Sequence, residues 1–308
     1  MPVDTHRAKA LPGRSGPQRR ALEEPAILRW GLIALAVTVI AVLVIVPVVN
    51  VFYQAFGAGL GGYWRSLTGD PDTRHAIFLT LIVAPIAVLA NVVFGIAAAW
   101  AIARFQFPGR TFLTTLIDLP FAVSPVVAGL MLVLLFGQMG YFGKELQALG
   151  IRILFAWPAI VLATTFVTVP FVARELIPVM AAIGSDEETA AVSLGASGWQ
   201  MFWRVTVPNI KWGLLYGVIL CNARAMGEFG AVYVVSGRIT GQTDTMPLRV
   251  EKLFQEGTNA GNAASFAVAS VLTFLALGTL GIKVVLEQKT RQDIESAAVT
   301  GSQAQEAP

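Results

Sequence analysis

Long apolar runs separated by polar connections dominate this chain. A helix needs roughly 20 apolar residues to cross about 30 Å of hydrocarbon. Six runs are long enough, and together they predict an all-α polytopic membrane protein with six transmembrane helices and both termini on one side. The runs cover residues 28–50, 77–103, 112–136, 153–173, 213–236 and 265–286.

The first apolar run is predicted to stay in the protein as a transmembrane helix. Its apolar core is longer than the 7 to 15 residues of a signal peptide, and no small-x-small cleavage site follows it. The fold is therefore expected to comprise a cytoplasmic N-terminal tail without fixed structure (1–26), a transmembrane domain (27–288) and a polar C-terminal tail (289–308), also expected to lack structure.

Composition supports a membrane protein. Hydrophobic residues make up 55% of the 308 positions and charged residues 13%, against about 25% charged in soluble domains. One Cys and two His do not suffice for a disulfide framework, a haem or a multi-Cys metal site, so no cofactor is expected. The GxxxxGK[ST] phosphate-binding pattern does not occur, so the chain is not expected to bind ATP by itself.

Positive charge predicts the orientation. Most Lys and Arg residues outside the spans fall in the two tails and in the second and fourth connections, on the side that holds both termini. Because cytoplasmic segments carry the excess of Lys and Arg, both tails are predicted to be cytoplasmic. The net charge of +3 then reflects this topology and contact with anionic lipid, and it gives no argument for nucleic acid.

The fourth connection, about residues 174–212, carries signals for two short helices. Ser185 followed by Glu188 is a capping box, which predicts a helix over about 186–194. Gly195 stands where a left-handed C-terminal cap is expected. We therefore expect an ordered segment here.

A second short helix is predicted directly after that glycine. Ser197 with Gln200 forms another capping box, and Pro208 ends this helix or begins the next element. Its apolar residues Trp199, Met201, Phe202 and Trp203 form a patch on the water side of the chain. Such patches mark interaction sites, and this one could cover either a partner protein or the lipid interface.

The run TAAVSLG followed nine residues later by VTVP resembles the EAA loop of bacterial ABC importer permeases, with the pattern E-A-A-x-x-x-G, nine residues, I-x-L-P. The resemblance implies the type I ABC importer transmembrane fold (MetI-like) in a bacterial inner membrane. It also implies a coupling helix that lies in a groove of a cytoplasmic ATPase. Thr189 replaces the usual Glu, and Glu188 lies one position earlier. The coupling residues implied are Glu188, Thr189, Ala190, Ala191, Gly195, Val205 and Pro208.

Arg224 and Glu228 lie inside the fifth predicted span. Nine Leu, Ile, Phe and Val residues between 213 and 236 contribute about −4 kcal/mol to insertion, and one Arg costs about 2.5 to 3.5 kcal/mol. The pair is therefore expected to face the bundle interior, on one helical face with Gly217, Cys221 and Ala231. The Gly213/Gly217 pair predicts a close helix approach.

Two interpretations of this pair stay open. In the structural one, Arg224 and Glu228 neutralise each other as an i,i+4 ion pair that bonds to neighbouring helices or a gate. In the functional one, they line a translocation path, where Arg224 attracts an anion and Glu228 prevents tight binding.

The run ARAMGEFGAV, the outer segment VVSGRITGQTDTMPLRVEKLF and the run GASGWQMFWRVTVPNIKWGLLYGV resemble the sulfate and molybdate branch of these permeases, above all the W-type sulfate/thiosulfate subunit family. The resemblance implies import of sulfate or thiosulfate, with molybdate or tungstate as the alternative. It also implies three partners: a second related permease subunit, two copies of an ATPase, and a periplasmic sulfate/thiosulfate-binding protein.

Other parts of the sequence carry weaker signals. The outer connection 236–265 predicts a turn and a short amphipathic helix, which either meets the binding protein or closes the outer mouth. Asp118 could be a proton site or could lie at the inner water boundary, and His75 is expected in solvent.

An ATP-independent secondary anion transporter would show an ion-coupling site and inverted repeats. An intramembrane enzyme would need paired Asp, or Ser with His, in its spans. Neither pattern is found. The EAA spacing together with the missing nucleotide-binding motif predicts a transport subunit without enzymatic activity of its own.

Overall fold

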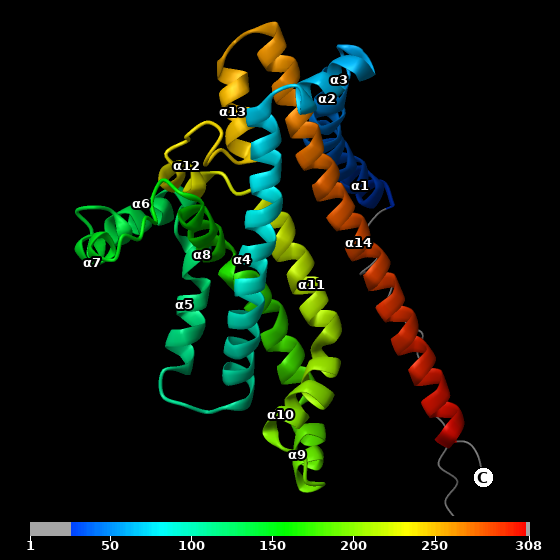
Figure 1. Cartoon of the computed structure of the whole chain (residues 1–308). Helices are drawn as coiled ribbons and strands as arrows, with labels where there is room; N and C mark the ends of the chain where they lie inside the picture. The colour runs from blue at the N-terminus through cyan, green and yellow to red at the C-terminus, as the bar shows by residue number, and fades with distance from the viewer. Residues whose placement is uncertain (1–25, 306–308) are drawn as a thin grey trace, which may run out of the picture. The chain divides into compact units, whose positions relative to one another are not determined.

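The computed structural model describes the backbone of residues 26–305 and the side chains of residues 27–288, and no strand occurs among them (Figure 1). Two compact units are distinguished, residues 1–50 and 51–308, and the sites discussed below belong to the second. The tail predicted for 1–26 lies outside the described residues except for Ala26. The elements are α1 (Ala26–Ile40), η2 (Ala41–Ile45), α2 (Val46–Ala55), α3 (Gly59–Thr68), α4 (Pro71–Arg104), α5 (Arg110–Ala122), α6 (Pro125–Phe136), α7 (Gly143–Ala148), α8 (Trp157–Ile183), α9 (Asp186–Ser193), α10 (Gly198–Met201), η3 (Phe202–Thr206), α11 (Val207–Met226), α12 (Gly230–Ser236), α13 (Met246–Gln255) and α14 (Asn259–Gln305).

Four helical stretches in the described residues are long and apolar enough to cross a membrane by themselves: 27–55, 71–104, 157–183 and 259–288. Two further spans are counted if each of two bent helix pairs crosses as one. The all-helical membrane fold expected from the apolar runs is thus observed. Its third and fifth predicted spans are not straight helices.

The third predicted span is broken into α5 and α6, whose axes differ in direction by 111°. Val123 and Ser124 are extended at the break, with ψ of 131° and 136°. Ser124 directly precedes Pro125, and proline disfavours the helical conformation in the residue before it. The single helix expected over 112–136 was therefore wrong in this detail, because its continuous apolar pattern conceals the break.

The fifth predicted span is bent by 54° between α11 and α12. Its first helix also starts earlier than expected, because α10, η3 and α11 follow one another without a gap from Gly198 to Met226. The π-type turn of η3 ends at Thr206, directly before α11, and Pro208 lies in the first turn of α11. The second of the two short helices in the fourth connection is thus continuous with the first part of the fifth span, whereas α9 is separate.

The core of the second unit forms where α4, α8 and α11 meet, and close approach is possible because glycines line the contacts. A Cβ at Gly95 of α4 would lie 2.7 Å from Val172 Cγ1 of α8. A Cβ at Gly213 would lie 3.0 Å from Val179 Cγ2, and one at Gly217 would lie 3.2 Å from Val172 Cα. The close approach predicted from the Gly213/Gly217 pair is confirmed, and α8 is the neighbour.

A buried polar cluster joins the same three helices. Asn91 Nδ2 of α4 donates to Thr168 Oγ1 of α8 at 2.7 Å, and Thr168 in turn donates to the carbonyl of Thr164 at 2.6 Å. Cys221 of α11 lies 3.6 Å from the same Asn91 nitrogen. Where neither lipid nor water offers a partner, such bonds hold helices in register.

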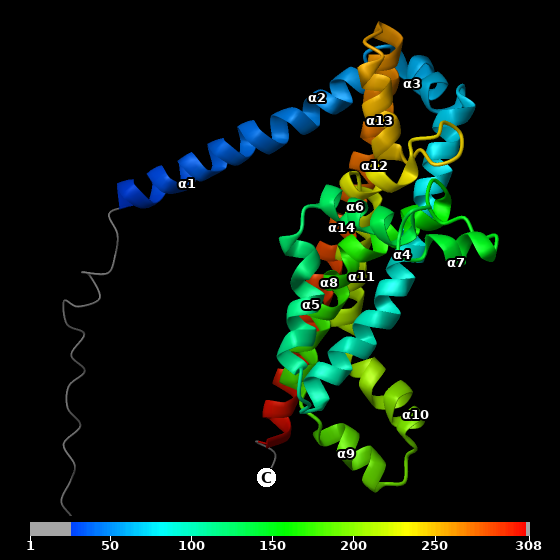
Figure 2. The same ribbon diagram turned by 90° about the vertical axis from the view of Figure 1, so that its left-hand side faces the viewer.

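The two ends of this bundle carry different structures. α13 lies beside the first turns of α4, while α9 and α10 lie at the opposite end, as both views agree (Figures 1 and 2). α13 is the short amphipathic helix expected in the outer connection, and it buries Met246, Leu248 and Leu253. α14 continues to Gln305, so the backbone is helical over most of the tail that was expected to lack structure after 289.

We predict that Gly95→Ala destabilises the protein by about 1 to 3 kcal/mol, because the added methyl group would press against the side chain of Val172 and the backbone of Ala173. The measurement is the midpoint of thermal unfolding of the purified protein. The matched control is Gly278→Ala in α14, where the new Cβ meets no described atom within 4 Å. Equal midpoints for the two variants would contradict this packing.

Candidate functional site

The first candidate site is the hairpin formed by α9, α10 and η3. Gly195 has φ of +93°, a left-handed conformation that favours glycine, as the sequence predicted. The capping box of Ser197 is also present, because Ser197 Oγ accepts from Gln200 N–H and Gln200 Oε1 accepts from Ser197 N–H. These two local signals place the turn between the two helices.

The capping box predicted at Ser185 is not formed, and this expectation was wrong. Ser185 is the N-cap residue of α9, but its side chain makes no capping bond. Glu188 instead accepts from Arg104 at the end of α4, through Nε at 2.9 Å and Nη2 at 3.1 Å. A charge-assisted, bidentate pair is stronger than a neutral backbone cap, so the distant arginine takes the carboxylate.

Glu188 also closes the hairpin itself. Thr206 Oγ1 of η3 donates to Glu188 Oε1 at 2.9 Å. A second bond joins Asn209 of α11 to the carboxylate of Glu187. The side chains of Arg104 and Glu188 are only 10% and 12% exposed, so water does little to weaken their attraction.

The other motif positions are distributed over the outside of the hairpin. Thr189 and Ala190 of α9 are exposed, as are Val192 and Leu194, while Ala191 is half-buried. The exposed side of α9 therefore combines acidic side chains in its first turn, Asp186 and Glu187, with small and apolar side chains toward its C-terminal end. Val205 is half-buried and Pro208 is exposed at the start of α11.

The predicted aromatic patch divides into two parts. Phe202 packs against Trp100 of α4, with ring centroids 5.7 Å apart, and Met201 accepts a hydrogen bond from Thr206. Trp199 and Trp203 stay exposed and contact each other edge to face. Only these two rings are therefore free to cover a partner or a lipid surface.

The second candidate site is the bend between α11 and α12. Arg224 Nη1 lies 2.7 Å from Glu228 Oε2, so the i,i+4 ion pair predicted from the sequence is present. The two side chains differ in environment, since that of Arg224 is 36% exposed and that of Glu228 is 1% exposed.

Glu228 is held at the bend by the backbone of α12. Because α11 ends at Met226, Glu228 does not continue its helical face as expected. Its Oε1 accepts from Ala231 N–H at 3.0 Å, at the positive end of the helix dipole of α12. Glu228 thus fixes the bend, and Arg224 neutralises it from the last turn of α11.

Sequence reasoning missed a second arginine in this part of the protein. Arg174 was assigned to the fourth connection, but α8 continues for nine residues beyond it to Ile183. Arg174 Nε lies 3.0 Å from Asp118 Oδ1 of α5, and its guanidinium lies over the ring of Phe121. Asp118 is therefore one partner of an ion pair and not an isolated acid. Hydrophobic periodicity gave no signal for this pair, because its members are distant in sequence.

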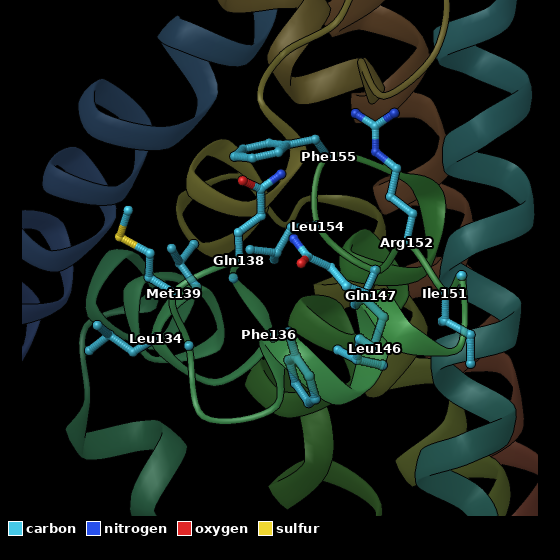
Figure 3. A pocket seen from close by; sticks show the side chains of 16 residues that line it. Leu134, Phe136, Gln138, Met139, Leu146, Gln147, Ile151, Arg152, Leu154 and Phe155 are labelled. Carbon is cyan, nitrogen blue, oxygen red and sulfur yellow. The ribbon is translucent and has the colours of Figure 1, made fainter.

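A cavity of about 630 Å³ lies elsewhere, around the connection from α6 to α8. Its walls are mainly apolar, with Gln138, Gln147 and Arg152 as the polar side chains, and Arg152 points away from the apolar floor formed by Phe136 and Leu146 (Figure 3). None of the predicted site residues lines it.

Known proteins provide an independent comparison. The sequence profile of the family described as "Binding-protein-dependent transport system inner membrane component" matches residues 91–292. The sulfate transport system permease protein CysW of Escherichia coli (strain K12) is 53% identical over 259 residues, which are 84% of this chain and 88% of that protein. CysT, named as a permease protein of the same kind of system in that strain, is 36% identical over 244 residues, or 78% of this chain and 88% of that protein.

A solved structure matches the fold. One chain of a bacterial alginate ABC transporter, crystallised with a periplasmic protein that holds an alginate pentasaccharide, superposes with a TM-score of 0.68 at 18% identity. The match covers 91% of this chain and 98% of that chain. At this identity the match shows the fold alone.

We predict that Arg224→Leu destabilises the protein by about 3 kcal/mol, whereas Arg224→Leu combined with Glu228→Gln costs clearly less. The single change leaves a buried carboxylate without its cation, and the second change removes that charge while an amide oxygen can still accept from Ala231 N–H. Thermal unfolding of the two purified variants measures the difference. An equal loss in both would mean that Arg224 acts through something other than this pair.

Proposed function

Since this chain belongs to the family of binding-protein-dependent transport system inner membrane components, we propose that it is the permease subunit through which an ATP-driven importer carries sulfate or thiosulfate. The observation that carries the proposal is the 53% identity with CysW over 84% of the chain. The W-type resemblance of residues 223–232 and of the hairpin points to the same substrate class.

In this proposal, the hairpin is the part of the chain that contacts the cytoplasmic ATPase. Small and apolar side chains are exposed toward the C-terminal end of α9, which suits a helix that lies in a groove of a cytoplasmic ATPase, and Asp186 and Glu187 add negative charge at its other end. Two ATPase copies would then drive one importer, and this chain hydrolyses no ATP itself. Both termini and α9 face the cytoplasm, as the positive charge of the sequence favours.

A related permease subunit completes the pathway. In Escherichia coli (strain K12), both a CysW and a CysT are named as permease proteins of a sulfate transport system, and this chain is similar to both. We infer that this chain pairs with a CysT-like subunit and that a periplasmic sulfate- or thiosulfate-binding protein docks on the side of α13. Lipid surrounds the remaining apolar faces.

Within this pathway we assign different roles to the two charges at the bend. Glu228 is buried and caps α12, so it shapes the bend. Arg224 is partly exposed, so the remaining donors of its guanidinium are available to an oxyanion. Glu228 keeps the local charge near zero, which prevents an anion from binding too tightly to leave.

We predict that expression of this chain together with its companion subunits restores uptake of radiolabelled sulfate to a bacterium that lacks its own sulfate permeases. Competition with unlabelled thiosulfate, molybdate and tungstate ranks the substrates.

The purified chain alone in liposomes should move no sulfate. ATP-independent uptake by that preparation would contradict the proposal. If the complete importer restores uptake of molybdate alone, molybdate and not sulfate is its substrate.

We predict that Gly195→Glu leaves the protein in the membrane at normal abundance but lowers uptake per ATP hydrolysed by at least about tenfold. A glutamate strains the left-handed turn and adds charge beside the proposed docking face. Gly195→Asn is the matched control, because Asn tolerates this conformation and carries no charge. Normal uptake by the Glu variant, at equal abundance, would be incompatible with a docking role for α9.

A further inference from the structure

α4 makes partly buried charged contacts at both of its ends. It contains 34 residues, which correspond to about 50 Å at 1.5 Å per residue. One end reaches the hairpin of α9, and the other lies beside α13 (Figure 1). It therefore extends between the two surfaces to which the proposed function assigns the ATPase and the binding protein.

The inner attachment is Arg104, the last residue of α4. Its guanidinium binds both carboxylate oxygens of Glu188 and donates through Nη1 to the carbonyl of Met180 at 2.7 Å. Met180 belongs to α8 and is fully buried. A displacement of α9 would therefore pull on α4 directly, and not only through the helix that continues into α11.

The outer attachment is Arg249 of α13. It binds the carboxylate of Asp70, the N-cap residue of α4, and its Nε donates to Thr73 Oγ1 at 3.3 Å. The backbone N–H of Met246 donates to Thr80 Oγ1 of α4 at 2.8 Å. The side chain of Arg249 is only 8% exposed.

The charge state of Asp70 suits this attachment. Burial raises the pKa of its carboxyl group, but hydrogen bonds from Thr73, from the Asp72 N–H and from Arg249 outweigh that effect, so the pKa lies below its ordinary value. Asp70 is therefore ionised at neutral pH and keeps its attraction to Arg249.

Between its two ends, α4 contains Pro85 but packs against α8 on both sides of this proline. Gly95 places it in direct contact with α8, and Asn91 bonds to Thr168 across the same interface. A shift at one end should therefore reach the other as movement of a packed, rigid element.

We propose that α4 is a strut that transmits movement between the coupling helix α9 and the outer helix α13, with Arg104 and Arg249 as the positioning residues at its two ends. The proposal rests on the function proposed above. Docking of a binding protein at α13 would bias the position of α9, and ATP-driven displacement of α9 would shift α13 in return, since coupling between two sites is reciprocal.

The test uses the complete importer in nanodiscs, with ATPase activity measured with and without the sulfate-loaded binding protein. We expect Arg104→Gln and Arg249→Gln each to keep basal hydrolysis and to lose about tenfold in stimulation by the binding protein. The double variant should lose no more than either single one, because a strut released at one end transmits nothing from the other. Additive losses, or full stimulation in either single variant, would overturn the proposal.

Two matched controls separate the strut from local stability. Glu187→Gln alters the bond from α9 to α11, and Glu251→Gln alters the pair of α13 with Arg238, but neither contact involves α4. Both variants should keep stimulation within about twofold of the parent. If these control variants lose as much stimulation as the arginine variants, loss of any polar contact in these regions reduces stimulation, and the specific role of α4 is refuted.

A charge exchange covers the case in which the single variants fold poorly. Arg104→Glu together with Glu188→Arg reverses the inner pair and should recover most of the stimulation that Arg104→Glu loses. Absence of recovery in a well-folded double variant would count against the strut. If the parent complex fails to assemble, hydrolyse ATP or import sulfate, the proposed function is at fault; if it does all three and the variants match it, only the strut is refuted.

Discussion

The close approach of α4, α8 and α11 is the constraint on which the rest of this structure depends. In hydrocarbon, helices gain little from burying apolar surface against each other, so association depends on direct packing and interhelical hydrogen bonds. Gly95 and Gly217 allow that packing by bringing their helices against Val172, and Asn91 adds a bond between the facing side chains. The positions of the hairpin, the bend and α13 all follow from this three-helix contact.

Two ion pairs within the bundle region each join two structural elements. Arg224 and Glu228 connect the end of α11 to the start of α12, and Arg174 and Asp118 connect α8 to α5. An unpaired charge is costly in a membrane, and a pair within one straight helix would stabilise only that helix. Placed between elements, the same charges hold bends and interfaces that apolar packing alone would leave variable.

The hairpin owes its order to both local and distant contacts. Gly195 and the capping box of Ser197 shape the turn from within, while Arg104 anchors α9 from another helix through Glu188. The exposed hydroxyl groups of Thr189 and Ser193 donate to carbonyl groups four residues earlier in the same segment. Arg104 thus holds α9 against the bundle while Thr189, Ala190 and Val192 stay exposed.

The sequence by itself determined the all-helical membrane class, the approximate extent of the spans, the turn at Gly195, the cap at Ser197 and the close approach at Gly213 and Gly217. Each of these depends on local periodicity or on a conformational preference of single residues, which need no knowledge of the rest of the chain. Tertiary structure decided the partner of Glu188, the pairing of Arg174 with Asp118, and the directions of α6 and α12 beyond their breaks. The physical reason is competition: a carboxylate accepts from the strongest donor within reach, and whether that is a neighbouring N–H or an arginine 84 residues away depends on which helices the core brings together.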